Sequence, residues 1–391
     1  MSVRLHPQPR RTVAAFLVAA VVTAGALAAA TAPAAATTNP PATLGGLELA
    51  RKAEIWQVPA GVPRPPALPA RGYLLADLTT GQILVAKDVH LRMRTASTMK
   101  VLTALTLLPR LSPSLVYTAR RADEDIDGSK VGVVAGSTYT VQQLFLGMML
   151  SSGNDAANAL ANAAGGVPKT VALMQQEATA LGARDTVVRD PSGLDSPGQG
   201  SSPYDLGLIA RAAMQRPDFR ALVSTKVARF PGKLVNGKRT KGFQIQNHNE
   251  LLTNYRGAIG VKTGYTVAAR WTYIGAARRG GHTYLVTEEG LNQQGWRPTM
   301  KMLDWAFAHG ASATPVGHLV TPAELASAAA TPTSGPTGHP PAAAPGSAAL
   351  ASAGGSASVS PTMRWAGIAG LAAAAAIIGG LGISAARRRR G

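Results

Sequence analysis

Apolar and polar residues follow two periods along the chain, and each change of period marks an expected element. Residues 73–76 and 83–87 have the pattern of β-strands and flank the turn Thr79-Thr80-Gly81, which predicts a β-hairpin. A helical stripe follows over 97–108, formed by Met99, Leu102, Leu105 and Leu108 and closed by Pro109. The folded part is therefore expected to open with a strand pair and a helix.

The middle of the chain has the period of helices. Thr140 is the expected N-cap of a helix with Leu144, Phe145, Met148 and Met149 on one face, and a second helix runs from Asp155 to Gly165. Strand patterns return at 259–265, 271–278 and 283–287, before a last helix over 298–309. We therefore expect an α+β fold, in which N- and C-terminal segments form one antiparallel sheet packed with helices, plus a helical subdomain.

Long apolar runs lie at both ends of the chain. Residues 1–36 combine arginines, an apolar run and small residues, which is typical of a secretory signal peptide; an uncleaved anchor is the alternative. Residues 365–386 would span roughly 33 Å as a helix, enough to cross a hydrocarbon core of about 30 Å. The arginines of residues 387–391 then favour a cytoplasmic tail and an extracytoplasmic head at the cell membrane.

A segment of low complexity precedes this apolar run. Residues 313–363 are rich in Ala, Pro, Ser, Thr and Gly, with Glu324 as the only acid and no lysine or arginine. Such a composition predicts a disordered tether, because it cannot bury enough apolar surface to fold. The folded domain is therefore expected at residues 48–312.

Charge and residue usage exclude several classes of protein. The formal net charge is +19, but lysines and arginines are scattered without a basic stripe, so we expect no nucleic acid partner. The chain has no cysteine, which excludes disulfides and thiolate chemistry.

Asp123, Asp125 and Asp127 resemble the start of a calcium loop, but the twelfth position of that loop, which needs a glutamate, is Val134. We therefore expect an acidic surface loop. We expect neither a metal nor a cofactor.

Three short motifs occur in order along the chain. They are Ser97-Thr98-Met99-Lys100, Ser152-Gly153-Asn154 and Lys262-Thr263-Gly264. Each is weak alone, because four residues of the S-x-x-K kind arise easily by chance. In this order, at a helix start, a helix break and a strand, they match the motif set of penicillin-binding proteins and class A β-lactamases.

The first motif predicts a serine nucleophile with a lysine base. Ser97 and Lys100 are one helical turn apart and can therefore touch without help from the rest of the fold. Lys100 can take the hydroxyl proton if burial and the nearby charge of Lys262 lower its pKa. We expect Ser97 to be the nucleophile and Lys100 the general base.

The other motifs predict groups that handle the substrate. Ser152 is expected to pass a proton to the leaving amine, and Asn154 to bond the substrate backbone or hold Lys100. Lys262, Thr263 and Gly264 are expected to bind the substrate, with the two side chains on a carboxylate. The backbone N–H groups of Ser97 and Tyr265 are the expected oxyanion hole.

With these motifs the chain resembles the serine-type D-alanyl-D-alanine carboxypeptidases, which are low-molecular-weight penicillin-binding proteins. The resemblance covers about residues 48–310 and extends to Asn154-Asp155-Ala156-Ala157, Ser192-Gly193-Leu194-Asp195, Asn247-His248-Asn249 and Gly264-Tyr265-Thr266. It implies a β-lactamase/transpeptidase-like fold and a peptidoglycan stem peptide ending in D-Ala-D-Ala as substrate. It also implies inhibition by β-lactams and a membrane anchor at the C-terminus.

Two features depart from this family pattern. The family often has Ala-Gly where this chain has Ala269-Arg270, which places a bulky cation at the edge of the site. Family members also hold the terminal carboxylate with an arginine on a late strand or before the last helix. Arg297 is the nearest candidate for that role here.

Three alternative functions fit parts of the pattern. A class A β-lactamase needs a loop glutamate, but between Asn154 and Lys262 the only glutamates, Glu177 and Glu250, lie in no E-x-x-L-N context. A D,D-endopeptidase uses the same groups as a carboxypeptidase. A non-catalytic wall-binding protein would keep the pocket but has no need of every motif residue. The carboxypeptidase is therefore the expected function.

Overall fold

One seven-stranded antiparallel sheet organises residues 43–330, the part of the chain that the computed structural model describes. The strands lie in the order β1-β3-β2-β12-β11-β10, and β13 also pairs with β3. Their bounds are β1 Ile55–Trp56, β2 Gly72–Asp77, β3 Gln82–Lys87, β10 Ala258–Thr266, β11 Arg270–Arg279, β12 His282–Leu291 and β13 Gly317–His318. Because β2 pairs with β12, the predicted sheet of N- and C-terminal segments is confirmed.

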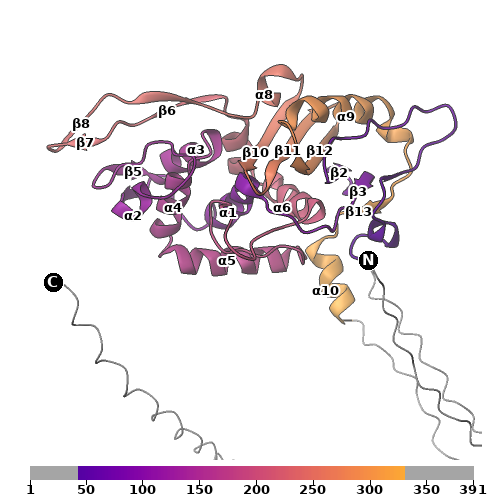
Figure 1. The fold of residues 1–391 in the computed structure, drawn as a ribbon, viewed down its shortest axis with the longest axis horizontal. Coiled ribbons are helices and arrows are strands. Elements are labelled where there is room, and N and C mark those ends of the chain that lie inside the picture. Colours follow the sequence, from indigo (N-terminus) through magenta and orange to yellow (C-terminus); the bar gives the residue numbers. More distant parts are fainter. Residues whose placement is uncertain (1–42, 331–391) are drawn as a thin grey trace, which may run out of the picture. The chain divides into compact units, whose positions relative to one another are not determined.

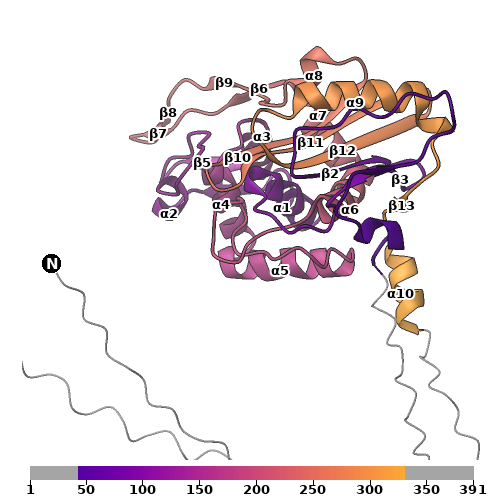
Figure 2. The same cartoon turned by 45° about the vertical axis from the view of Figure 1, so that its right-hand side comes forward.

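Helices cover both faces of this sheet (Figures 1 and 2). α9 (Trp296–His309) packs on one face, where Tyr73 and Leu75 join its Met302 in one apolar cluster. The alternate residues Leu74 and Ala76 join the core on the other face. That face is covered by α1 (Lys100–Leu107), α6 (Pro203–Gln215) and α7 (Pro217–Ser224). Because successive side chains of a strand point to opposite faces of the sheet, alternate residues of β2 pack in two separate cores.

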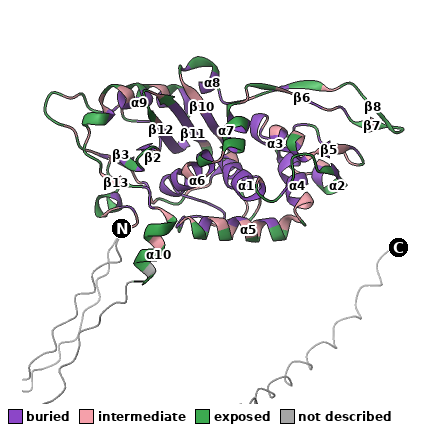
Figure 3. Cartoon of the chain, turned by 180° about the vertical axis from the view of Figure 1, so that it is seen from behind, coloured by how far each residue is buried: buried purple, intermediate pink, exposed green. Residues whose placement is uncertain are grey.

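A helical subdomain stands beside the sheet, as the sequence predicts. It contains α2 (Arg121–Glu124), α3 (Val141–Leu150), α4 (Asn154–Ala163), α5 (Val167–Ala180) and the strands β4 (Val116–Thr118) and β5 (Thr138–Thr140). Thr140 caps α3 by accepting from the backbone of Gln143, whose side chain accepts in return. Figure 3 shows buried residues on α1 and α6 and many exposed ones along α5.

A long hairpin projects past α3 and was not predicted from the sequence (Figures 1 and 2). It is built from β6 (Val227–Phe230), β7 (Leu234–Val235), β8 (Lys238–Arg239) and β9 (Phe243–Gln246). Phe230 fixes its base, because this ring is fully buried and stacks on Tyr139 with the ring centroids 5.4 Å apart. The remaining described elements are η1 (Leu47–Ala50), η2 (Ala96–Met99), α8 (Leu251–Asn254), η3 (Gly310–Ser312) and α10 (Pro322–Ala330).

Residues 313–330 correct the expected start of the tether. They contain β13, which pairs with β3, and α10. Leu319 is buried, and its backbone oxygen accepts from Arg211 of α6. Thr321 and Glu324 form reciprocal hydrogen bonds at the start of α10. The tether predicted from residue 313 is therefore wrong for this stretch, because Leu319 and Val320 pack in the core and Arg211 binds the chain beside them.

The predicted terminal segments lie largely outside the described residues. The expected signal peptide at 1–36, the apolar span at 365–386 and the tail at 387–391 all lie there, as does the tether beyond residue 330. Between residues 43 and 330, no helix is long and apolar enough to cross a membrane.

Glu288 of β12 is a carboxyl group buried between sheet and helix. Its Oε1 accepts a hydrogen bond from Thr299 of α9, and its Oε2 has no partner among the described residues. Burial raises the pKa of Glu288 to about 8. The group is therefore protonated at neutral pH, and the fold is stabilised by keeping that proton.

We expect Glu288 to make stability depend on pH. The folded state holds one more proton than the unfolded state between the ordinary pKa of 4.5 and about 8. The free energy of unfolding therefore falls by about 1.4 kcal/mol per pH unit from this group as pH rises through that window. In Glu288→Gln, urea unfolding at several pH values should show a slope shallower by about this amount. The exposed control Glu48→Gln should keep the wild-type slope; an unchanged slope in Glu288→Gln contradicts the assignment.

Candidate active site

The start of the first long helix presents Ser97 and buries Lys100. Ser97 lies in η2 and is partly exposed, whereas Lys100 begins α1 and is fully buried. The turn before them is fixed by Thr98 and Thr272, whose hydroxyls both donate to the carbonyl of Thr95. The hydroxyl of the predicted nucleophile is therefore held at the surface on a rigid turn.

The amine of Lys100 contacts three oxygens from three segments of the chain. Its Nζ lies 2.8 Å from Ser97 Oγ, 2.7 Å from Asn154 Oδ1 and 2.6 Å from the backbone oxygen of Ser192. Asn154 is itself held, because its Nδ2 donates to the carbonyl of Asp127 at 2.7 Å. The structure thus brings together the predicted nucleophile, base and amide.

Burial and a nearby cation both act on the pKa of the Lys100 amine. Both lower the pKa of Lys100 well below its ordinary value, with burial the larger cause and the charge of Lys262 the second. A neutral amine has two N–H groups and one lone pair. The two N–H groups match Asn154 and Ser192, and the lone pair is left for the Ser97 hydroxyl. Such an amine can accept the hydroxyl proton.

The second lysine contacts the second serine. Lys262 Nζ donates to Ser152 Oγ at 3.0 Å and to its neighbour's carbonyl, that of Thr263, at 2.8 Å. Burial lowers the pKa of Lys262 to about 7. Ser152 reaches this position with a left-handed backbone, φ 59°, in the break between α3 and α4. The pair therefore places a proton carrier beside the nucleophile's base.

A glycine lets strand β10 pass directly by Ser97. A Cβ at Gly264 would lie 2.8 Å from the backbone nitrogen of Ser97 and 2.4 Å from Thr272 Oγ1. Only glycine allows this approach. Tyr265, the next residue, is 54% exposed and its ring packs on Trp271. The backbone of β10 therefore forms one wall of the site.

Thr263 follows Lys262 on β10 and borders a small cavity. It lines a space of about 120 Å³ together with His248, Trp271 and Trp296. Burial and the charge of Lys262 lower the pKa of His248, so this imidazole is neutral at pH 7. No pattern in the sequence predicts a substrate contact for His248, although the residue lies in the Asn247-His248-Asn249 motif.

The structure does not bring Arg297 to Thr263. Its guanidinium lies 4.4 Å from the ring centroid of Trp296, and the side chain lines a separate cavity with Lys301 and Asp304. Trp296 lines both cavities. The arginine therefore stacks on the ring instead of joining the groups around Lys262.

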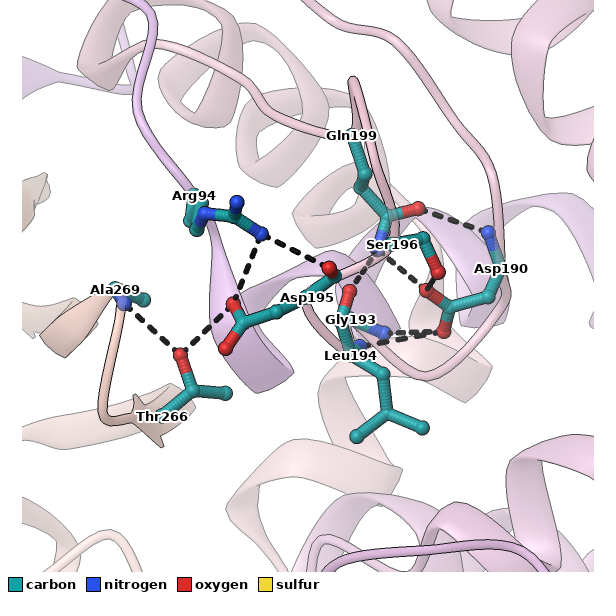
Figure 4. Close-up of polar contacts among 9 residues, drawn as sticks. All are labelled: Arg94, Asp190, Gly193, Leu194, Asp195, Ser196, Gln199, Thr266 and Ala269. Carbon is teal, nitrogen blue, oxygen red and sulfur yellow. Dashed lines mark hydrogen bonds and ion pairs between the residues drawn. The ribbon is translucent and has the colours of Figure 1, made fainter.

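The loop at residues 190–199, for which the sequence predicts no role, supports the general base Lys100. Asp190 accepts hydrogen bonds from the backbone of Ser192, Gly193 and Leu194 and from the side chains of Ser196 and Gln199. Figure 4 shows this carboxylate at the centre of the loop. A Cβ at Gly193 would lie 1.7 Å from the carbonyl oxygen of Ala96. The loop thus sets the Ser192 carbonyl against Lys100.

The same loop is tied to the end of β10. Thr266 Oγ1 donates to Asp195 Oδ1 at 3.0 Å and accepts from the backbone N–H of Ala269, while Arg94 donates to the Asp195 carbonyl (Figure 4). These contacts join the segment before Ser97, the loop and the β10–β11 turn. The rim of the site is therefore one connected network.

The acidic segment 123–128 has one buried carboxylate. Asp123 is fully buried and accepts from Tyr117, Asn158 and Asn162, so the expected surface position is wrong for this residue, whereas Asp125 and Asp127 are exposed as expected. Among residues 43–330 no cluster of histidine, cysteine, aspartate or glutamate is placed to hold a metal ion. The loop instead supplies the Asp127 carbonyl that orients Asn154.

Known proteins share this architecture. The family described as D-alanyl-D-alanine carboxypeptidase matches residues 60–287. The carboxypeptidase DacB2 of Mycobacterium tuberculosis is 43% identical over 257 residues, which are 64% of this chain and 86% of the relative. DacD of Salmonella typhimurium is 33% identical over 62% of this chain and 64% of its own length.

Solved structures agree with the sequence relatives. A D-alanyl-D-alanine carboxypeptidase from Mycobacterium tuberculosis superposes with a TM-score of 0.62 at 41% identity, covering 68% of this chain and 99% of that one. A Streptomyces DD-transpeptidase superposes with a TM-score of 0.60 at 32% identity, covering 63% and 100%. The family match spans more than half of the chain, and the three motifs meet around Ser97. The chain therefore belongs to the D-alanyl-D-alanine carboxypeptidase family.

Proposed function

We propose that this chain is a serine D,D-carboxypeptidase that removes the terminal D-alanine from peptidoglycan stem pentapeptides through an acyl-enzyme on Ser97. The observation that carries the proposal is the fully buried amine of Lys100, 2.8 Å from Ser97 Oγ. A hydroxyl is a weak nucleophile unless a base removes its proton. The lowered pKa of Lys100 makes its amine that base.

The reaction follows from the contacts around these two residues. Ser97 Oγ attacks the carbonyl of the penultimate D-alanine, and its proton passes to Lys100 Nζ. The backbone N–H groups of Ser97 and Tyr265 stabilise the oxyanion, since β10 passes close to the serine. Ser152 gives its proton to the leaving nitrogen of D-alanine and regains one from Lys262, 3.0 Å away. The proton that Lys100 took from Ser97 recharges Lys262, so Lys100 is again a neutral base for the attacking water. Water then hydrolyses the ester.

The terminal carboxylate of the substrate binds at the middle of β10, beside Lys262 and Thr263. Lys262 supplies the positive charge beside Ser152, and Thr263 supplies a hydroxyl at the cavity that it lines with His248. Asn154 keeps Lys100 in line through its Oδ1 at 2.7 Å. Arg297 does not contribute to carboxylate binding, because its guanidinium stacks on Trp296.

β-Lactams acylate the same serine, and the ester should persist. Fast release in class A β-lactamases needs a glutamate beside the ester. Here Glu177 lies on α5 near Arg110, at 3.9 Å, and Glu250 is exposed at the start of α8. Neither contacts the residues around Ser97. This favours a penicillin-binding enzyme over a β-lactamase.

We also propose that the enzyme is exported and anchored in the cell membrane by a single span. The support is the signal-like pattern of residues 1–36, the apolar segment 365–386 and the arginines after it. A head held outside the membrane meets cell-wall peptides. Residues 331–363 would serve as the tether, since the domain extends to residue 330.

Replacing the nucleophile should abolish turnover. Ser97→Ala should release D-alanine from a pentapeptide at least about a thousandfold more slowly than the parent, because no other group can form the ester. Quantifying free D-alanine, with labelled penicillin as a second probe, measures this. Ser112→Ala, an exposed serine elsewhere, is the matched control. Parent-like release by Ser97→Ala would refute the mechanism.

Removing the apolar tail should release the enzyme. A chain ending at residue 363 should appear in the soluble extracellular or periplasmic fraction with penicillin-binding intact, whereas the full chain should sediment with membranes. Fractionation followed by fluorescent penicillin labelling checks this. Equal sedimentation of both chains would count against the anchor.

A further inference from the structure

Four arginines line a cavity at the far end of the rim. Arg71, Arg92, Arg94 and Arg270 surround a space of about 370 Å³, closed by the loop at Gly198 and the turn at Ala269. Figure 4 shows Arg94 in contact with Asp195, and the backbone of Ala269 in contact with Thr266, next to the hydrogen bond between Asp195 and Thr266. The cavity therefore begins where the wall of the catalytic site ends.

The positive charge of this cavity is mostly uncompensated. Arg94 lies 3.6 Å from the carboxylate of Asp195, which is the one ion pair that the four arginines form within residues 43–330. Arg92 donates to the carbonyl of Gly198 and Arg270 to the amide oxygen of Asn292, and neither partner carries a charge. Converging guanidinium groups of this kind match a carboxylate, which they bind with paired hydrogen bonds.

The backbone holds two of these arginines in place. Arg270 has a left-handed φ of 61°, a conformation that a glycine would adopt without strain. Arg71 lies along Gly290, where a Cβ would sit 2.9 Å from its Cδ. In the β10–β11 hairpin, Arg270 pairs directly with Thr266. The backbone of Arg270 is therefore fixed beside the last residue of β10, and its guanidinium is held by Asn292.

The direction of the substrate leads to this end of the strand. β10 is the edge strand of the sheet, so its outer side can pair with an extended peptide. A peptide that runs antiparallel to β10, with its terminal carboxylate near Lys262, directs its preceding residues toward Thr266. From Gly264 to Thr266 the strand advances roughly 7 Å, about two residues of an extended peptide.

We propose that the arginine cavity binds a carboxylate on the residues that precede D-Ala-D-Ala in the donor peptide. This inference rests on the proposed function, because the position of the scissile bond sets the direction. The cavity selects acidic over amidated stem peptides, and the selection is made by Arg71 and Arg270, which the structure leaves without an acidic partner among its described residues.

The test uses four peptides that end in D-Ala-D-Ala. They carry glutamate or glutamine at each of the two preceding positions. The wild type should favour an acidic peptide over its all-glutamine form by on the order of tenfold in kcat/KM, mainly through KM. In Arg71→Ala/Arg270→Ala that ratio should fall to about one. The exposed control Arg184→Ala should keep the wild-type ratio. Thermal unfolding checks that each variant is folded.

A binding measurement tests the arginine cavity independently of the catalytic mechanism. Calorimetry with the Ser97→Ala chain measures the Kd of the same peptides without turnover. Tighter binding of an acidic peptide, lost in the triple variant that also carries both arginine changes, supports the cavity even if no peptide releases D-alanine. Equal Kd and equal kcat/KM for acidic and amidated peptides would contradict carboxylate binding in the arginine cavity and leave the Ser97 mechanism unaffected. A preference that survives the double arginine change would also contradict carboxylate binding in this cavity.

Discussion

The contact between a fully buried lysine amine and a partly exposed serine is the interaction on which the rest of the site depends. Lys100 sits where the first helix, the start of α4 and the 190–199 loop converge, and each contributes one oxygen. A charged amine would be poorly tolerated there. Burial therefore drives it toward the neutral form, which is also the form that can act as a base.

Close backbone packing makes this arrangement possible. Gly264 brings β10 against the backbone of Ser97, and Gly193 brings the loop against Ala96. Any side chain at either glycine would push one wall away from the serine. The Asp190 carboxylate then saturates the loop's N–H groups, so that the Ser192 carbonyl stays pointed at the lysine. Reactivity is thus built from tightly packed main chain as much as from side chains.

The sequence predicted what depends on local spacing. The strand pairs, the helix after Ser97 and the order of the three motifs are local patterns, and the family that they indicate is confirmed. The contributions of Ser192 and Asp127 could not be predicted, because any residue has a backbone carbonyl. Composition was misleading after residue 313, although the Thr321 and Glu324 pair carried a capping signal. The contact of Arg297 with its neighbour Trp296 could not be predicted either, because the family pattern gives the position of an arginine and not the direction of its side chain.

The proposed mechanism requires a neutral Lys100, and the pH dependence of Ser97 acylation tests this requirement most directly. The rate constant for acylation by penicillin should rise with pH and reach its plateau well below pH 10, because the pKa of the base is lowered. Lys100→Arg, which stays charged, should be slower by roughly a hundredfold or more at every pH. The exposed Lys130→Arg should match the wild type. A wild-type midpoint near the ordinary lysine pKa, or rapid acylation of Lys100→Arg, would contradict the account.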